Sequence, residues 1–172
     1  PIARFRSEQA TSAPLEVIDL AIDRLTKQRR LKRRGDVLAI ASFDPFEALD
    51  SSSKAKLVSL ERRLEQGGLS PPDISSVAHL AGKGNTLMGL LVATKRVVKL
   101  HNASLRRDLY FHVKALNTGA AQLRAAFPFP ETFTVGEARA ELGITRKHIV
   151  PILEYFDARG ITLRRGDFRI CQ

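Results

Sequence analysis

The sequence contains very little cysteine and few large aromatic residues. Its 172 residues include one cysteine, Cys171, two tyrosines and no tryptophan. A single cysteine excludes an internal disulfide and a cysteine-rich zinc site, and so few large aromatic rings leave little surface for stacking nucleobases. The longest apolar run, about residues 87–93, is far shorter than the roughly 20 residues that a membrane span requires. We therefore expect no membrane segment and no signal peptide.

What the sequence has in excess is positive charge. Its 28 lysines and arginines, against 18 aspartates and glutamates, leave a formal net charge of +10. Residues 51–112 hold 10 basic and 4 acidic side chains, so the excess is concentrated in the middle third. A surplus of this size indicates a polyanionic partner, such as a nucleic acid or an acidic membrane surface.

A pattern of one helix followed by two short strands recurs along the chain. In residues 18–41, apolar residues at helical spacing precede a basic stretch, a turn at Gly35 and a short apolar strand. The same order returns 131 positions later, in residues 149–171, and a weaker copy occupies residues 87–112. Two shorter helical patterns precede the second and third copies. Three helices followed by a two-stranded wing are typical of the winged-helix variant of the helix-turn-helix.

We therefore predict a mostly α-helical, α+β protein made of tandem winged-helix domains, the three-helical bundle type that binds DNA or RNA. The predicted domains are residues 1–50, 51–112 and 113–172. The first has no room for its first helix, and the chain begins with Pro1 instead of methionine. For both reasons we expect the chain to start inside a domain of a longer protein.

No group of residues matches a known catalytic arrangement. The four histidines are scattered and none forms a metal-binding pair, so we expect neither an enzyme nor a metal site. Residues 82–86 look like a phosphate loop, but they lack the Walker spacing and follow no strand. They are better explained as the turn before a helix that Thr86 caps.

The most informative segment begins at Thr145, a suitable N-cap for a helix whose first residues are Arg146 and Lys147. The first turn of a helix carries free backbone N–H groups and the positive end of the helix dipole. Two cationic side chains there make the turn a candidate phosphate-binding site. The alternative is an ordinary helix cap with solvated charges.

Pro151 lies inside the same predicted helix. It cannot donate a hydrogen bond to the carbonyl of Lys147, and a proline in a helix interior costs on the order of 3 kcal/mol. We therefore expect the helix either to bend at Pro151 or to start later. One hypothesis is that a bend directs the turn at Arg146 and Lys147 toward a ligand.

The predicted wing carries Arg164 and Arg165 before its turn and Arg169 after it. Because side chains alternate along a strand, Arg164 and Arg165 are expected on opposite faces. Glu154 and Asp157, on the preceding helix, are interpreted as partners of arginines on the helix or the wing and not as a catalytic pair.

The C-terminal segment resembles a known family, the bacterial selenocysteine-specific elongation factor SelB. The resemblance covers about 40 residues and is carried by the pattern Thr145-Arg146-Lys147-x-x-x-Pro151-x-Leu153-Glu154-Tyr155-x-Asp157-x-x-Gly160-x-Thr162-x-Arg164-x-Gly166-Asp167-x-Arg169. The upstream units resemble the rest of that family's C-terminal winged-helix array. By this resemblance the three units are part of the second winged helix, the third, and the fourth and last.

The resemblance implies a role in translation. The full factor is a GTPase that delivers selenocysteyl-tRNA to the ribosome at an in-frame UGA codon, and its last winged helix grips an mRNA hairpin, the selenocysteine insertion element. GTP and magnesium would bind only the N-terminal part, so we expect no cofactor in this chain. We expect a cytoplasmic monomer whose partners are the mRNA hairpin, the ribosome and, through the absent domains, selenocysteyl-tRNA.

The RNA contact is expected at an apical loop and a bulged base, because the major groove of A-form RNA is too narrow for a helix. The residues expected to make it lie at the start of the third helix, on the wing and on the short helix before: Thr145, Arg146, Lys147, Arg164, Arg165, Arg169 and Arg139. Of these, Arg146 and Lys147 would hold phosphates, and Thr145 would reach backbone or base edges.

Two other classes of protein fit the same pattern. Winged helices most often read DNA with the third helix in the major groove, although Pro151 interrupts that helix here. A winged-helix scaffold for protein interaction would instead tolerate alanine at Arg146, Lys147 and Arg165. The basic middle unit is expected either to contact ribosomal RNA or tRNA, or only to present solvated charge.

Overall fold

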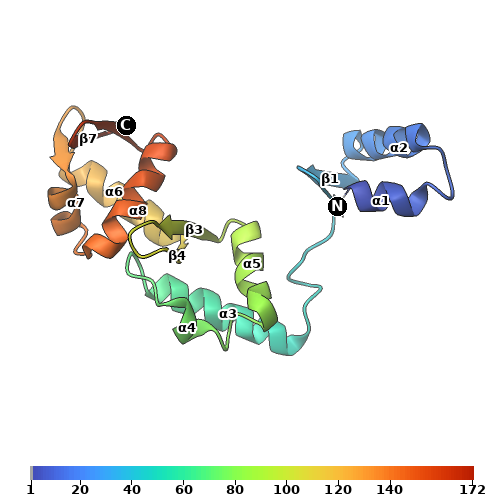
Figure 1. The fold of residues 1–172 in the computed structure, drawn as a ribbon, viewed down its shortest axis with the longest axis horizontal. Coiled ribbons are helices and arrows are strands. Elements are labelled where there is room, and N and C mark those ends of the chain that lie inside the picture. The colour runs from blue at the N-terminus through green and yellow to red at the C-terminus, as the bar shows by residue number, and fades with distance from the viewer. Residues whose placement is uncertain (1) are drawn as a thin grey trace. The chain divides into compact units, whose positions relative to one another are not determined.

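The computed structural model describes residues 2–172, and the chain divides into two compact units, Pro1–Ala48 and Leu49–Gln172. Figure 1 shows helices joined to short antiparallel hairpins in both units. The predicted fold class is confirmed, since the elements are those of an α+β winged-helix protein. Within the described residues, no helix combines the length and the apolar character needed to cross a membrane.

The first unit consists of two helices and a hairpin. Ile18 and Ile22, one turn apart, are the buried residues of the second helix, and Gly35 makes the hairpin turn with a φ of 56°. The helix, turn and strands predicted in residues 18–41 are therefore present. The elements are α1 (Ile2–Gln9), α2 (Leu15–Lys27), β1 (Leu31–Arg34) and β2 (Val37–Ile40).

Residues 51–112 form three helices and a longer wing. Asp50 caps the first helix, because its Oδ1 accepts a hydrogen bond of 2.9 Å from the N–H of Ser53. Leu60 and Leu64 of that helix are fully buried. The elements are α3 (Ser51–Gln66), α4 (Ile74–Val77), the 3-10 turn η1 (Lys83–Asn85), α5 (Thr86–Ala93), β3 (Val97–Asn102) and β4 (Arg107–His112).

Residues 113–172 form the most complete winged helix. Its three strands pair in the order β5-β7-β6, and a capping box between Thr134 and Glu137 starts its second helix. The elements are α6 (Val113–Ala126), β5 (Thr132–Thr134), α7 (Val135–Glu141), α8 (Arg146–Ala158), β6 (Thr162–Arg165) and β7 (Phe168–Cys171).

The wing of the middle winged helix contributes to the hydrophobic core of the last one. Strand β4 leads directly into α6, so no linker lies between them. Leu109 and Phe111 of β4 are buried in the same cluster as Leu116 of α6 and Phe156 of α8. The core of the last winged helix therefore extends across the predicted boundary after residue 112, and the division into three domains stays a prediction.

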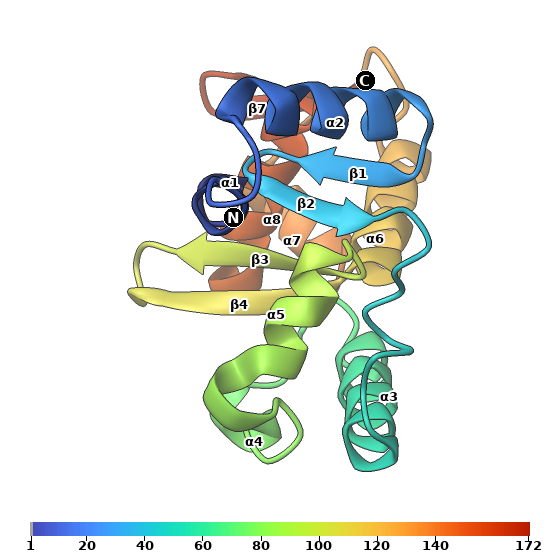
Figure 2. The same ribbon diagram turned by 90° about the vertical axis from the view of Figure 1, so that its right-hand side faces the viewer.

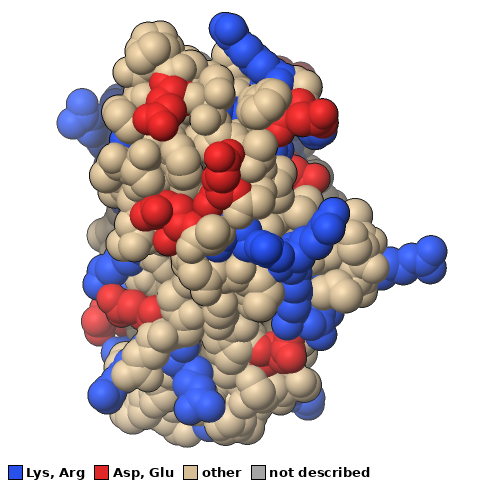
Figure 3. All heavy atoms as spheres, turned by 90° about the vertical axis from the view of Figure 1, so that its left-hand side faces the viewer, with Lys and Arg blue, Asp and Glu red and all other residues tan. Residues whose placement is uncertain are grey.

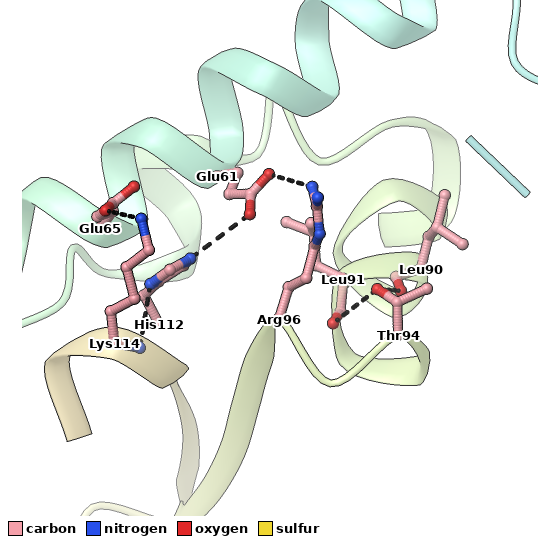
Figure 4. A network of polar contacts seen from close by, with 8 residues as sticks. All are labelled: Glu61, Glu65, Leu90, Leu91, Thr94, Arg96, His112 and Lys114. Carbon is pink, nitrogen blue, oxygen red and sulfur yellow. Dashed lines mark hydrogen bonds and ion pairs between the residues drawn. The ribbon is translucent and has the colours of Figure 1, made fainter. Parts of the chain in front are cut away.

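Ion pairs reinforce the joint between β4 and α6 (Figure 4). Glu61 of α3 lies 2.7 Å from Nη1 of Arg96 and 3.5 Å from Nε2 of His112. Nearby, Nζ of Lys114 lies 2.7 Å from Oε1 of Glu65. The hydrogen bond from Lys114 lowers the pKa of Glu65, and the same bond raises the pKa of Lys114. Helix α3 is thus tied to both the wing of its own winged helix and the first helix of the next.

Candidate nucleic-acid interface

The predicted phosphate-binding turn lies at the start of α8. The first hydrogen bonds of this helix are donated by His148 and Ile149 to the Thr145 carbonyl, at 2.9 and 3.1 Å. Among the described residues, the N–H groups of Arg146 and Lys147 have no acceptor and the Thr145 side chain makes no cap hydrogen bond. Thr145 and Arg146 are exposed. The turn therefore presents two backbone donors and a guanidinium to an anion, while the Thr145 hydroxyl lies 3.4 Å from Nδ1 of His148.

Lys147 is engaged by the middle winged helix. Its Nζ lies 3.2 Å from Oδ1 of Asp73, which immediately precedes α4, and Nη2 of Arg107 lies 3.2 Å from the same oxygen. The hydrogen bond from Lys147 lowers the pKa of Asp73, and the charges of Lys147 and Arg107 add to this effect. All three side chains are partly exposed, so water screens the attraction, and a phosphate can compete with the carboxylate.

Helix α8 runs unbroken through Pro151. The predicted alternative of a later helix start is therefore wrong, and a bend that directs the turn toward a ligand stays a prediction. The carbonyl of Lys147 accepts a hydrogen bond of 2.7 Å from Nδ2 of Asn102, the last residue of β3. Pro151 has no N–H to donate to this carbonyl, so a side chain of the middle winged helix donates the hydrogen bond instead.

His148 belongs to the core and not to the surface of the turn. Only 6% of it is exposed, its ring meets that of Phe111 edge-on at 6.2 Å, and no described residue pairs with its Nε2. Burial lowers the pKa of His148, and the charge of Lys147 lowers it further, against an opposing effect of Asp73. The imidazole is therefore neutral at pH 7 and serves the packing between β4 and α8.

Arg164 and Arg165 are exposed on the wing. In the register of the hairpin, Arg164 stands opposite Arg169 and Arg165 opposite Phe168, so the two arginines project from opposite faces. Nε of Arg164 donates to the carbonyl of Gly166 at 3.1 Å, which holds it near the wing turn. Each of the two arginines is accessible to a ligand on the face of the hairpin from which it projects.

Arg169 has a different role from the one predicted. Its side chain is 6% exposed, with Nη2 2.9 Å from Oδ2 of Asp157 and Nε 3.0 Å from the same oxygen. The predicted pairing of Asp157 with a wing arginine is thereby confirmed. The expectation that Arg169 clamps RNA from the wing is not supported, because this buried pair fixes β7 to α8 and keeps the guanidinium from solvent.

The remaining predicted cation, Arg139, is exposed on α7. Figure 3 shows one face of the molecule, on which lysines and arginines project among aspartates and glutamates instead of forming one continuous basic surface. The charges on this face alone therefore do not mark a nucleic-acid-binding site, and a site has to be argued from the positions of individual residues.

The structure brings together residues that are far apart in the sequence. Asp73 and Asn102 of the middle winged helix contact Lys147 at the start of α8, and Arg107 pairs with the same oxygen of Asp73. Sequence reasoning missed them because the contacts of Lys147 with Asn102 and Asp73 span 45 and 74 positions. The one available signal was the carbonyl that Pro151 leaves unpaired, which requires a donor from elsewhere.

Fold and site together define a tandem winged-helix protein in which α8 starts with the predicted anion-binding turn. In a comparison with known proteins, residues 130–171 match the model of the winged helix of elongation factor SelB, which its name numbers as the third. The predicted resemblance to the C-terminal winged-helix array of SelB is confirmed. The numbering of the last unit as the fourth stays a prediction.

Individual relatives agree with this assignment. The chain is 26% identical over 160 residues to a selenocysteine-specific elongation factor of Desulfomicrobium baculatum, which covers 90% of the chain and 24% of that protein. The chain thus spans about a quarter of the length of this curated relative.

Solved structures show the same fold. The crystal structure of a bacterial selenocysteine-specific elongation factor, EF-Sec, matches 86% of the chain and 22% of its own, with 20% identity and a TM-score of 0.59. The mRNA-binding domain of SelB from E. coli, in complex with SECIS RNA, matches 72% of the chain and 99% of its own, with 22% identity and a TM-score of 0.53.

Proposed function

We propose that this chain is the mRNA-binding part of a selenocysteine-specific elongation factor and that its last winged helix holds the selenocysteine insertion hairpin. The observation that carries the proposal is the start of α8, where backbone N–H groups without acceptors stand beside the exposed Thr145 and Arg146. Support comes from the family of residues 130–171 and from a solved relative that is an mRNA-binding domain in complex with RNA.

The turn suits a splayed RNA strand better than a regular duplex. Paired A-form RNA hides its base edges in a narrow groove, whereas an apical loop or a bulge exposes phosphates and bases together. Arg146 and the two N–H groups hold a phosphate, and Thr145 reaches backbone or base edges. Lys147 adds a second cation when a phosphate replaces the Asp73 carboxylate. Arg164 or Arg165 extends the contact from the wing, and Arg139 is a secondary contact.

We propose a wider role by analogy with the selenocysteine-specific elongation factors that the chain resembles. The chain tethers the GTPase and tRNA-binding domains of a longer factor to the ribosome, next to the hairpin, and GTP and magnesium bind those domains. The factor works in the cytoplasm as a monomer. In this role the chain itself catalyses no reaction, and residues 51–112 act as the rigid support that carries the RNA-binding winged helix.

A titration with three nucleic acids tests the proposal. The chain is titrated with a bulged hairpin from the source organism's selenoprotein messages, the same hairpin without its bulge, and duplex DNA, each at two salt concentrations. Tight binding to the bulged hairpin alone is expected. Equal, steeply salt-dependent binding to all three would mean nonspecific attraction by the net charge of +10. A preference for duplex DNA would favour a transcription regulator, and no binding would favour a protein-interaction scaffold.

A further inference from the structure

Pro151 leaves one carbonyl of α8 without its helical partner. In a regular helix the carbonyl of residue 147 accepts from the N–H of residue 151, but proline has no N–H to donate. That carbonyl belongs to Lys147, the second residue of the anion-binding turn, and it accepts from Nδ2 of Asn102 at 2.7 Å. The donor comes from the wing of the middle winged helix and enters at the turn itself.

Asn102 is held rigidly for this contact. It is 5% exposed, and its Oδ1 accepts a hydrogen bond of 2.9 Å from the N–H of Leu105 in the turn after β3. Because Oδ1 of Asn102 is bound by this turn, Nδ2 on the other side of the amide is directed toward the Lys147 carbonyl. Both polar atoms of the side chain are therefore satisfied, as a buried amide requires.

The wing turn of the middle winged helix lies directly beside the anion-binding turn. Figures 1 and 2 both show β3 next to α8. Residues 101–105 line one groove together with Arg146, Lys147 and Pro151. The middle winged helix thus contacts Lys147 at two points: Asn102 donates a hydrogen bond to its carbonyl, and Asp73 forms an ion pair with its Nζ.

We propose that Asn102 is a positioning residue for RNA binding: it fixes the first turn of α8, so that the N–H groups of Arg146 and Lys147 face the RNA phosphate. This inference rests on the proposed function. If Asn102 has this role, RNA affinity depends on the middle winged helix through one internal hydrogen bond. Asn102 itself does not contact the RNA.

Replacing Asn102 tests the proposal on the full chain. Asn102→Ala is expected to weaken binding to the bulged hairpin by about two- to tenfold, the range set by one internal hydrogen bond. Asn102→Ser, whose hydroxyl is too short to reach the carbonyl, should behave alike. Ser104→Ala, an exposed neighbour in the same wing turn, is the matched control and should bind as the wild type does. If Asn102 only held the two winged helices together, both Asn102 variants would melt earlier yet bind the hairpin with unchanged affinity.

A double-mutant cycle with Pro151 isolates the hydrogen bond. Pro151→Ala restores an N–H at position 151, which can bond the Lys147 carbonyl within the helix. In the Pro151→Ala background, the change in log Kd caused by Asn102→Ala should be less than half of the change that Asn102→Ala causes in the wild-type background. An equal loss of affinity in both backgrounds would overturn the proposed role.

Amide hydrogen exchange separates this inference from the proposed function. His148 and Ile149 donate to the Thr145 carbonyl, so their exchange rates report the order of the turn without RNA. Asn102→Ala should speed both rates, and Ser104→Ala should not. Wild-type protein that fails to bind any hairpin refutes the proposed function. Unchanged exchange at both amides refutes the positioning role of Asn102, whatever the RNA result.

Discussion

Individual arginines of the last winged helix serve two different purposes. Arg169 is almost fully buried against Asp157, whereas Arg146 is exposed at the start of α8. Removing one partner of a buried ion pair destabilises a protein because the other charge stays in a poorly solvated place. Replacement of Arg169 would therefore lower stability along with any effect on binding, and only exposed positions such as Arg146 give interpretable binding data.

Strand alternation alone did not distinguish these roles. It predicted correctly that Arg164 and Arg165 face opposite ways. For Asp157, the sequence left open whether the partner is an arginine of the helix or of the wing, and the structure shows the wing residue Arg169. Strand alternation could not show which arginine points to α8, since that depends on the twist and position of the hairpin against the helix. The burial of His148 also depends on a contact that is distant in the sequence, because its neighbour Phe111 lies in β4.

The buried His148 makes stability depend on pH. Burial lowers its pKa in the folded chain, so the unfolded chain binds the proton more tightly. Above about pH 6.5, the pKa of histidine in the unfolded chain, His148 is mostly neutral in both states and does not lower the stability. As the pH falls below that value, the unfolded chain takes up the proton more readily, so the free energy of unfolding decreases. The loss approaches at most about 1.4 kcal/mol per pH unit. Urea unfolding between about pH 7.5 and 5 should show this decline.

His148→Leu provides the comparison for this pH effect. It should abolish that part of the pH dependence, whereas His79→Leu, at an exposed histidine, should keep it. An identical pH profile for the wild type and His148→Leu would show that this imidazole is not the responsible group.

At the scale of elements, strand β4 joins two winged helices. It pairs with β3 in the middle wing, and its residues Leu109 and Phe111 are buried in the core of the last winged helix. The sequence predicted the strand and the helix after it, because apolar residues alternate there and a helical pattern follows. It could not show that both winged helices share the strand, since a periodic pattern reveals a buried face but not what covers it.

Phe111→Ala tests whether the two winged helices unfold together, since Phe111 belongs to the middle wing and is buried in the core of the last winged helix. Deleting a fully buried phenylalanine side chain costs about 3–5 kcal/mol, and here the loss should destabilise residues 49–172 as one cooperative unit. Denaturant unfolding, followed by exchange of amides on α3 and on α6, should show the same shift at both helices. A shift confined to one of them would mean that the two winged helices unfold separately.

At the scale of the whole molecule, all the residues of the proposed RNA contact lie within the unit Leu49–Gln172. The sequence predicted the winged-helix repeat, the SelB resemblance and the first turn of α8. It did not predict that the middle winged helix supplies Asp73 and Asn102 to that turn, because such contacts arise only when β3 packs on α8. Contacts of the middle winged helix with ribosomal RNA or tRNA stay a proposal.

The salt dependence of hairpin binding by Arg146→Ala tests the central claim most directly. Each phosphate that a cation neutralises adds about 0.7–0.9 to the slope of log affinity against log salt. Arg146→Ala should therefore weaken binding and reduce this slope by about that amount. Arg159→Ala removes the same charge from the other end of α8, where the guanidinium lies 5.4 Å from the Tyr155 ring centre, and should leave the slope unchanged. Equal effects of the two replacements would contradict a phosphate site at the start of α8.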